Sequence, residues 1–177
     1  VWPSLQGEAP DDKHRIAHSI MRKVGQAVSN KHQMHMAGIS EASHRDDNLY
    51  TKIGLGFQIR RPIPKDEGRK LLLECAEELL GEINARTDFQ PFLHEYPFPV
   101  QNISLEFFVY DEDGGRLYHP EITVFSLHKV NLEFLTKSSK KKHGYFSEEE
   151  ETYEEAIKLF KRQHRIWPKR KRQMTNN

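Results

Sequence analysis

The sequence predicts an α+β domain with a three- or four-stranded, mainly antiparallel sheet, a central helix on one face, and flanking N- and C-terminal helices. Residues 53–60 and 103–109 alternate apolar and polar side chains, which is typical of a strand with one buried face. Residues 12–31 and 65–86 repeat apolar side chains every three or four positions, as amphipathic helices do. A sheet that buries only one face is usually antiparallel. No apolar run in the sequence approaches the ~20 residues of a membrane-spanning helix.

The first half of the chain is predicted to contain two helices and one strand. Residues 1–10 have two prolines and no periodicity, and they are interpreted as a flexible lead-in. The helix over residues 12–31 begins at acidic side chains, which suit the positive end of the helix dipole. Residues 32–47 lack a pattern and are interpreted as a connection. The strand at 53–60 ends at prolines, which cannot donate to a β-ladder, and the helix at 65–86 follows.

The second half is predicted to be rich in strands until its last helix. A corner at residues 91–99 precedes the strand at 103–109, because no regular element accepts three prolines in nine residues. A glycine-containing turn leads to residues 122–136, which form either two strands with a polar break between them or one long bent strand. Ser147 and Glu150 match a capping box, in which each side chain bonds a free backbone N–H at a helix start. The last helix is therefore expected to begin there and to end at Pro168.

A single domain over residues 11–166 is predicted, between the lead-in 1–10 and a basic, flexible tail at 167–177. The first two strands are joined through a helix, and a connection of that length allows them to be parallel. Three aromatic side chains of the corner are expected to cap one end of the core: Phe92, Tyr96 and Phe98.

Charge is segregated toward the C-terminus, although the formal net charge is only +1. Residues 148–155 contain six Glu and no base, whereas residues 158–172 contain eight bases and no acid. Acidic residues at a helix start and basic residues at its end suit the helix dipole. The dipole therefore accounts for all of these charges except the basic residues at the end of the run. The excess bases could bind phosphates of a nucleic acid or of an acidic membrane surface, whereas a solvated, unstructured tail is the simpler interpretation. The candidate anion-binding residues are Lys140, Lys141, Lys142, Lys169, Arg170, Lys171 and Arg172.

Ten histidines raise the alternative of a metal-dependent enzyme. His14 and His18 are four residues apart, which places two imidazoles side by side on a helix. His32 and His35 could add ligands, with His44 further on. A zinc site needs three or four rigidly held ligands, and this stretch is interpreted as a loop. Surface and boundary histidines are therefore the favoured interpretation, and no cofactor is expected.

The remaining motifs of the sequence do not predict a metal site, a cofactor site or a catalytic residue. The calcium-loop-like start at Asp111 lacks a Glu at its twelfth position, which is Ile122. Gly54 and Gly56 lie within a strand and have no third glycine, so they do not form a dinucleotide-binding loop. They are interpreted instead as relieving crowding on the outer face of the sheet. Cys75 lies on the apolar stripe of a helix, where burial raises the pKa of a thiol. No catalytic residue is predicted, and a non-enzymatic role is favoured.

Two segments carry a resemblance to known proteins. Ile83-Asn84-Ala85 closes a helix, and the corner Pro91-Phe-Leu-His-Glu-Tyr-Pro-Phe98 precedes a strand. Through these segments the stretch Ile53–Thr136 resembles a group of small, uncharacterised bacterial α+β proteins. The resemblance covers about half of the chain, implies no activity and assigns no functional residues.

The sequence thus favours a bacterial α+β module that binds a partner protein. Anion binding through the basic C-terminal region and metal-dependent catalysis through the N-terminal histidines are the alternatives. The single cysteine excludes an intramolecular disulfide and favours a reducing compartment. The start at Val1 without Met fits either a removed signal peptide or a removed non-globular region. Export or association with the cell envelope is favoured over a cytoplasmic location.

Overall fold

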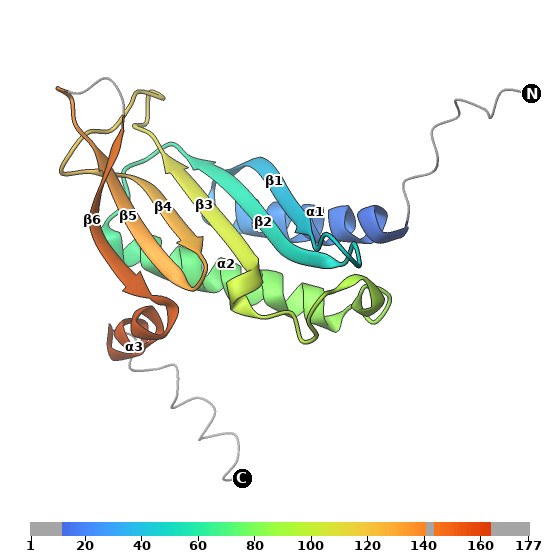
Figure 1. The fold of residues 1–177 in the computed structure, drawn as a ribbon. Coiled ribbons are helices and arrows are strands. Elements are labelled where there is room, and N and C mark those ends of the chain that lie inside the picture. The colour runs from blue at the N-terminus through green and yellow to red at the C-terminus, as the bar shows by residue number, and fades with distance from the viewer. Residues whose placement is uncertain (1–11, 141–143, 164–177) are drawn as a thin grey trace, which may run out of the picture.

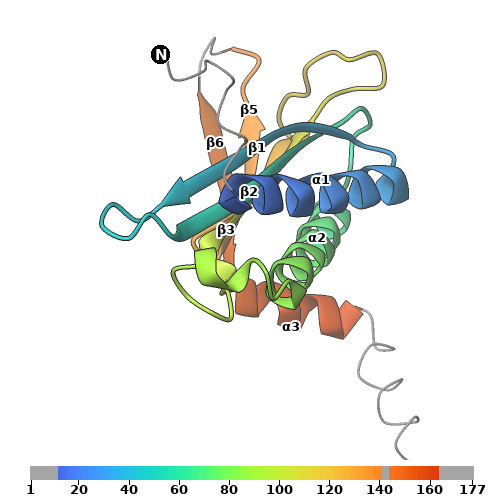
Figure 2. The same cartoon turned by 90° about the vertical axis from the view of Figure 1, so that its right-hand side faces the viewer.

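The computed structural model describes residues 12–140 and 144–163, in which three helices cover one face of a six-stranded sheet (Figure 1, Figure 2). The helices are α1 (Asp12–His32), α2 (Lys65–Ala85) and α3 (Tyr153–Gln163). The strands are β1 (His35–Ser43), β2 (Tyr50–Ile59), β3 (Ile103–Val109), β4 (Ile122–His128), β5 (Asn131–Lys137) and β6 (Tyr145–Thr152). Short 3-10 turns at Gln90–Phe92 and Val100–Asn102 shape the chain between α2 and β3.

The α+β class is confirmed, and the sheet is mixed. Strands β2 and β3 are parallel, with Ile53 opposite Ile103 and Ile59 opposite Val109, and α2 is the crossover between them. All other neighbouring strands in the described sheet are antiparallel. The helical connection between the first two predicted strands therefore does produce a parallel pair, as its length allows.

The predicted number of three or four strands is wrong, because the sequence pattern hides β1 and β6. Strand β1 lies within residues 32–47, which were expected to be a connection, and its side chains are exposed or half-buried along its whole length. With neither face buried, β1 has no apolar alternation to detect. Strand β6 is rich in Glu, a residue with low β propensity. Its Glu149 and Glu151 pair with Lys65 and Arg69 of α2, which hold this edge against the helix layer.

The last helix begins later than the sequence predicts. Ser147 and Glu150 lie within β6, not at a helix start. The capping box is formed by Thr152 and Glu155: the backbone N–H of Glu155 donates to Thr152 Oγ1, and that of Thr152 donates to Glu155 Oε2, both at 3.1 Å. Two neighbouring sequences, 147–150 and 152–155, thus match the capping motif, and the first of them lies within the strand.

Residues 122–136 form two strands, which settles the alternative between a hairpin and a bent strand. Lys129 and Val130 connect β4 to β5, with φ angles of +47° and +62°. Positive φ at both central residues is the mark of the tight turn that matches the twist of a hairpin. The carbonyl of Val130 also accepts the backbone N–H of Tyr153 at 2.7 Å, so the turn is bonded to the first residue of α3.

The core lies between the sheet and the helix layer. The apolar stripe of α2 is buried as predicted, including Cys75, and the alternating residues of β2 and β3 face it. Gly68 lets α2 approach the sheet, because a Cβ at this position would collide with the ring of Phe125. Across the parallel pair, the rings of Phe57 and Phe107 lie 5.5 Å apart between centroids.

The proline-rich corner is bound to the end of α2. The side chain of Asn84 accepts the backbone N–H of Phe98 at 2.7 Å and donates to the carbonyl of Phe98 at 3.1 Å. Phe98 is buried and Phe92 is half-buried against the core, as predicted. Tyr96 is 48% exposed and does not cap the core, because its hydroxyl donates instead to the carbonyl of Asn84 at 3.2 Å.

The predicted lead-in at 1–10, tail at 167–177 and helix end at Pro168 lie outside the described residues, so the domain limits 11–166 stay a prediction. Among the described helices, none has the length and apolar character needed to cross a membrane.

Candidate functional site

One face of the sheet is left open by the helices, as Figure 1 shows. On strands β1, β2 and β3 its floor is built from glycine and serine, with Ser40, Gly54 and Ser104 side by side across the three strands. A Cβ on Gly54 would collide with Ser40 Oγ and lie 2.8 Å from the carbonyl oxygen of Ser104. The crowding that the sequence implied at Gly54 is therefore caused by the neighbouring strands themselves. The small floor leaves a shallow hollow of about 270 Å³ beside Phe108 and Lys52.

The two edges of the sheet differ in character. Within the described residues, β1 pairs only with β2, so the N–H and C=O groups on its other side have no strand partner. Its first six side chains are exposed, and Met36 and Ile39 are large apolar residues at 39% and 42% exposure. Edge strands of this kind usually carry charges that prevent pairing with another chain. Strand β6 carries such charges at Glu149 and Glu150, whereas residues 35–40 of β1 include no Asp, Glu, Lys or Arg.

A second hollow, of about 110 Å³, lies toward the far side of the open face. It is lined by the aromatic rings of Phe108, Tyr110 and Tyr145 together with the cations Arg116 and Lys137. Lys137 Nζ lies 5.9 Å from the centre of the Tyr145 ring. Among the described residues that line this hollow, none is acidic. The hollow is therefore chemically suited to an anionic group on an apolar or aromatic body.

Most of the predicted anion-binding residues lie outside the described part of the chain: Lys141, Lys142, Lys169, Arg170, Lys171 and Arg172. Lys140 is described and exposed, in the turn that follows β5, where its backbone N–H donates to Ser138 Oγ at 3.2 Å. The cations that line this hollow are Lys137, which begins the basic segment 137–142 of the sequence, and Arg116, which the sequence did not single out. Their proximity follows from the strand pairing and leaves no local signal in the sequence.

The histidines proposed as metal ligands do not come together. His14 and His18 do lie side by side on α1, and both face Glu41 of β1, with Nε2–carboxylate distances of 3.4 and 3.7 Å. His32 instead lies 3.4 Å from the carboxylate of Glu74 on α2, and burial lowers the pKa of its imidazole. His35 lies at the start of β1, opposite Gln58.

The structure therefore does not bring His14, His18, His32 and His35 together as one group of ligands. A shared carboxylate accounts for the first two histidines, and strand pairing separates the last one from them.

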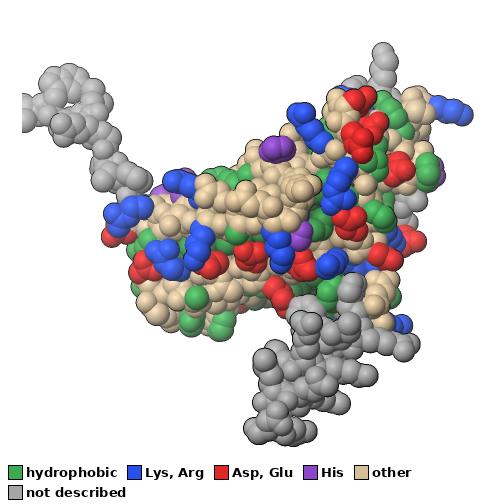
Figure 3. All heavy atoms as spheres, turned by 180° about the vertical axis from the view of Figure 1, so that it is seen from behind, with side chains coloured by type: hydrophobic (Ala, Val, Ile, Leu, Met, Phe, Trp, Pro, Cys, Tyr) green, Lys and Arg blue, Asp and Glu red, His purple; other side chains and the backbone are tan. Residues whose placement is uncertain are grey.

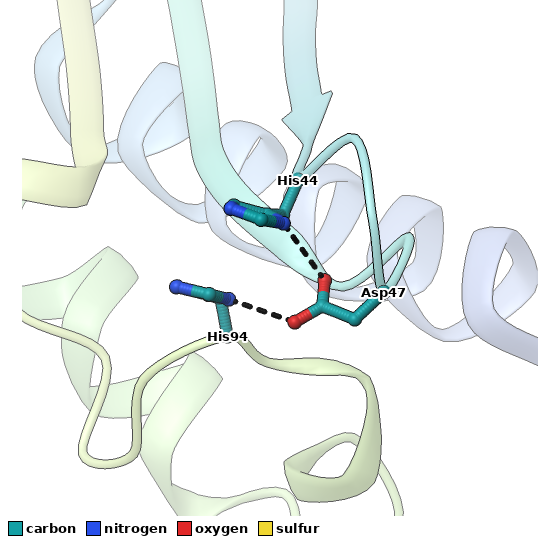
Figure 4. A group of neighbouring side chains, drawn as sticks. All are labelled: His44, Asp47 and His94. Carbon is teal, nitrogen blue, oxygen red and sulfur yellow. Dashed lines mark hydrogen bonds and ion pairs between the residues drawn. The ribbon is translucent and has the colours of Figure 1, made fainter.

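A different group converges beyond the end of β1. His44 and Asp47 lie in the loop between β1 and β2, and His94 lies in the proline-rich corner (Figure 4). Asp47 Oδ2 lies 3.0 Å from His94 Nδ1, and Asp47 Oδ1 lies 3.6 Å from His44 Nδ1. The two imidazole rings are stacked, with centroids 4.6 Å apart and planes within 8° of parallel. The second ring nitrogen of each histidine points away from the carboxylate.

Backbone hydrogen bonds hold these three residues in place. The N–H of His44 donates to the carbonyl of Leu49 at 2.8 Å and closes the loop, while the N–H of His94 donates to the carbonyl of Tyr50 at 3.0 Å. A parallel bridge between Tyr50 and Leu93 brings the corner beside the start of β2. The Leu49 N–H, donating to Asp47 Oδ1 at 2.9 Å, and then His94 lower the pKa of the Asp47 carboxyl. Of these three residues, only His44 was a candidate metal ligand from the sequence, because His94 has no spacing relation to it.

Cys75 is buried within the described core, and burial raises the pKa of its thiol, as its position on the apolar stripe predicted. A thiol in this state is not a nucleophile.

The fold and its surfaces define a one-sided α+β sheet protein with an exposed edge strand that has few charged residues. No protein-family model matches the sequence, and comparisons with curated proteins and with solved structures find no match.

Proposed function

We propose that the protein is a non-enzymatic binding module that takes up an extended segment of a partner protein along the free edge of β1. The observation that carries this proposal is the contrast between the two edges, since β6 carries a run of acidic residues and the exposed residues 35–40 of β1 carry none. An extended segment that pairs with β1 would bond its free N–H and C=O groups and become a seventh strand. Main-chain hydrogen bonds supply affinity in this mode, and side-chain pockets supply specificity.

The hollow beside β1 supports the same mode of binding. It lies on the open face next to the edge, and its floor of small residues leaves space above Gly38 and Gly56. A long side chain of the incoming segment would extend over Gly38 and Ser40 into the near end of this hollow, which is also lined by Lys52 and Glu106. The mixed charge around this hollow favours a protein segment over a nucleic acid, because a phosphate backbone requires a continuous run of cations.

Site-specific photo-crosslinking in the native cell tests this proposal. A photoreactive residue at Ile39 is expected to give a covalent adduct with one partner protein. The matched control is Tyr118, which is equally exposed, at 41% against 42%, and lies in the loop between β3 and β4. Ile39→Lys, which places a charge on the edge, is expected to abolish an adduct formed from a photoreactive residue at Met36. Equal labelling from Ile39 and Tyr118, or no adduct from Ile39, would contradict strand addition at β1.

Anion binding is a second candidate function, favoured by the acid-free hollow between Arg116 and Lys137. If it is correct, the protein is retained on heparin or on nucleic acid in a salt-dependent manner. Replacing both Arg116 and Lys137 by Ala should then elute the protein at lower salt, whereas Lys129→Ala, in the β4–β5 turn, should not. Removal of residues 169–172 tests the predicted basic tail in the same assay. Retention that none of these changes lowers would exclude both anion sites.

A further inference from the structure

We propose that His44, Asp47 and His94 form a binding site for a divalent transition cation of the zinc class. This site lies at the β1–β2 loop and is separate from the edge and the hollows of the open face. Among the residues that the structure describes, this is the one group of three histidine, cysteine or acidic side chains whose ligand atoms all lie within 4.8 Å of one another.

The spacing of the ligand atoms fits a tetrahedral ion. Zinc binds imidazole nitrogen and carboxylate oxygen at about 2.0–2.1 Å, so neighbouring ligands of a tetrahedral site lie about 3.3 Å apart. The two nitrogen–oxygen distances of the group, 3.0 Å to His94 and 3.6 Å to His44, lie on either side of that value. Small side-chain rotations therefore suffice to convert the group into a coordination sphere.

The hydrogen-bond pattern also favours a cation at this place. The backbone N–H of Asp46 donates to His44 Nδ1 at 3.2 Å, so this nitrogen carries no proton, and an ion would take the place of the N–H on its lone pair. Asp47 Oδ1, which carries negative charge, lies 3.6 Å from the same nitrogen. The ring nitrogen and the carboxylate oxygen therefore lie close enough for one ion to contact both.

Two structural properties define the kind of site. The loop is closed by the hydrogen bond from the N–H of His44 to the carbonyl of Leu49, and the corner is held by that from the N–H of His94 to the carbonyl of Tyr50. The ligands are therefore positioned before any ion binds. The side chains are 40%, 40% and 35% exposed for His44, Asp47 and His94, which leaves a coordination position open to water or to a further ligand. Two imidazoles with one carboxylate select Zn²⁺, Cu²⁺ or Ni²⁺ over Mg²⁺ and Ca²⁺, which prefer oxygen ligands alone.

Calorimetric titration of the metal-free full chain with Zn²⁺ tests the proposal. We expect one ion per chain, with His94→Ala and Asp47→Asn each lowering the affinity more than ~10-fold, the scale by which even outer-shell changes weaken metal sites. His18→Ala is the matched control: it removes an exposed histidine that also faces a carboxylate, and it should leave zinc affinity unchanged. If His94→Ala does not fold, His94→Gln keeps a polar side chain without an imidazole and gives the same test.

Three results would overturn the proposal. They are the absence of zinc binding by the native chain, zinc binding that survives loss of His94 or Asp47, and an equal loss of affinity in His18→Ala, which would move the site to α1. Titration with Mg²⁺ in place of Zn²⁺ checks the class of cation, since equally tight Mg²⁺ binding would contradict a site built on imidazole.

Discussion

Gly68 shows how a single residue sets the distance between two layers. It lies in the first half of α2, directly over the ring of Phe125 on β4, and a Cβ at this position would overlap that ring. Gly81, in the same helix, has nothing within 4 Å of the place where its Cβ would be. Both glycines weaken the helix intrinsically, but only Gly68 is required by packing.

We expect Gly68→Ala to lower the free energy of unfolding by about 1–3 kcal/mol, because the added methyl group must displace Phe125 or the helix. Gly81→Ala should instead raise the free energy of unfolding by up to about 1 kcal/mol, because alanine is the better helix former. Urea denaturation of both variants measures these changes. A stabilising effect at both positions would show that α2 does not pack on Phe125 as described.

At the residue scale, the sequence predicts which side chains are buried better than it predicts which side chains come together in a candidate binding site. Cys75 was correctly placed in the core, because its position follows from a helical repeat of apolar residues. The group of His44, Asp47 and His94 depends on the bridge between Tyr50 and Leu93, a tertiary contact that leaves no periodic pattern. His14 and His18 were correctly predicted to be neighbours, but Glu41, the residue that they share, comes from a strand that was not predicted.

At the scale of elements, Arg69 joins α2 to β6. Its side chain is 6% exposed, its Nε lies 2.8 Å from the carboxylate of Glu151, and its guanidinium lies over the ring of Phe134. Glu151 is itself only 10% exposed, so each charge depends on the other for compensation. Asp66, one turn earlier in α2, also pairs with Arg69, and this contact lowers the pKa of the Asp66 carboxyl.

Arg69→Ala is expected to lower the free energy of unfolding by about 3–5 kcal/mol, because it leaves the buried charge of Glu151 without a partner. Arg61→Ala, which breaks an exposed pair with Glu67, should cost less than about 1 kcal/mol. Chemical denaturation measures both. Replacing Arg69 and Glu151 together by Met should recover most of the loss. A double variant as unstable as Arg69→Ala would contradict the account of an uncompensated charge.

The same contacts explain why β6 escaped prediction. A run of glutamates beside a capping motif is typical of a helix start, and the local sequence offered no reason to choose a strand. The cations Lys65 and Arg69, far away in the chain, neutralise part of the run and make a strand tolerable at this edge. Strand β1 escaped for the opposite reason, because it buries too little of either face to show an alternating pattern.

At the scale of the whole molecule, the α+β class and the two long helices could be predicted, whereas the parallel pair was only left open and the third helix was given too early a start. The class and the two helices follow from repeats that are long enough to read: the stripes of α1 and α2, and the alternation of β2 and β3. The two strands that were not predicted are the two edges of the sheet. Edge strands bury less of their inner face, so their sequences do not alternate apolar and polar residues. They are also the elements on which the proposed binding mode depends.

The helix side of the molecule carries charged side chains of both signs over its surface. Figure 3 shows this side, where Lys and Arg side chains are interspersed with Asp and Glu. Interspersed charges of both signs are typical of a solvated surface. Two hollows lie on the opposite, open face, beside the strands on which the proposed binding depends. A further hollow lies along α1 and is lined by the cations Arg15, Arg22 and Lys23.

The order of the strands has a consequence for how the chain reaches this fold. Because sheet order repeats chain order, all strand pairings except β2–β3 join segments that are separated only by a turn or a loop. Such pairings close quickly, since short loops lose little entropy. The β2–β3 ladder must instead wait for the segment 60–102 to bring its ends together through α2. The sheet thus consists of a hairpin, β1–β2, and a four-stranded meander, β3–β6, each of which can form from local pairings. The parallel pairing of β2 with β3 joins the two units last.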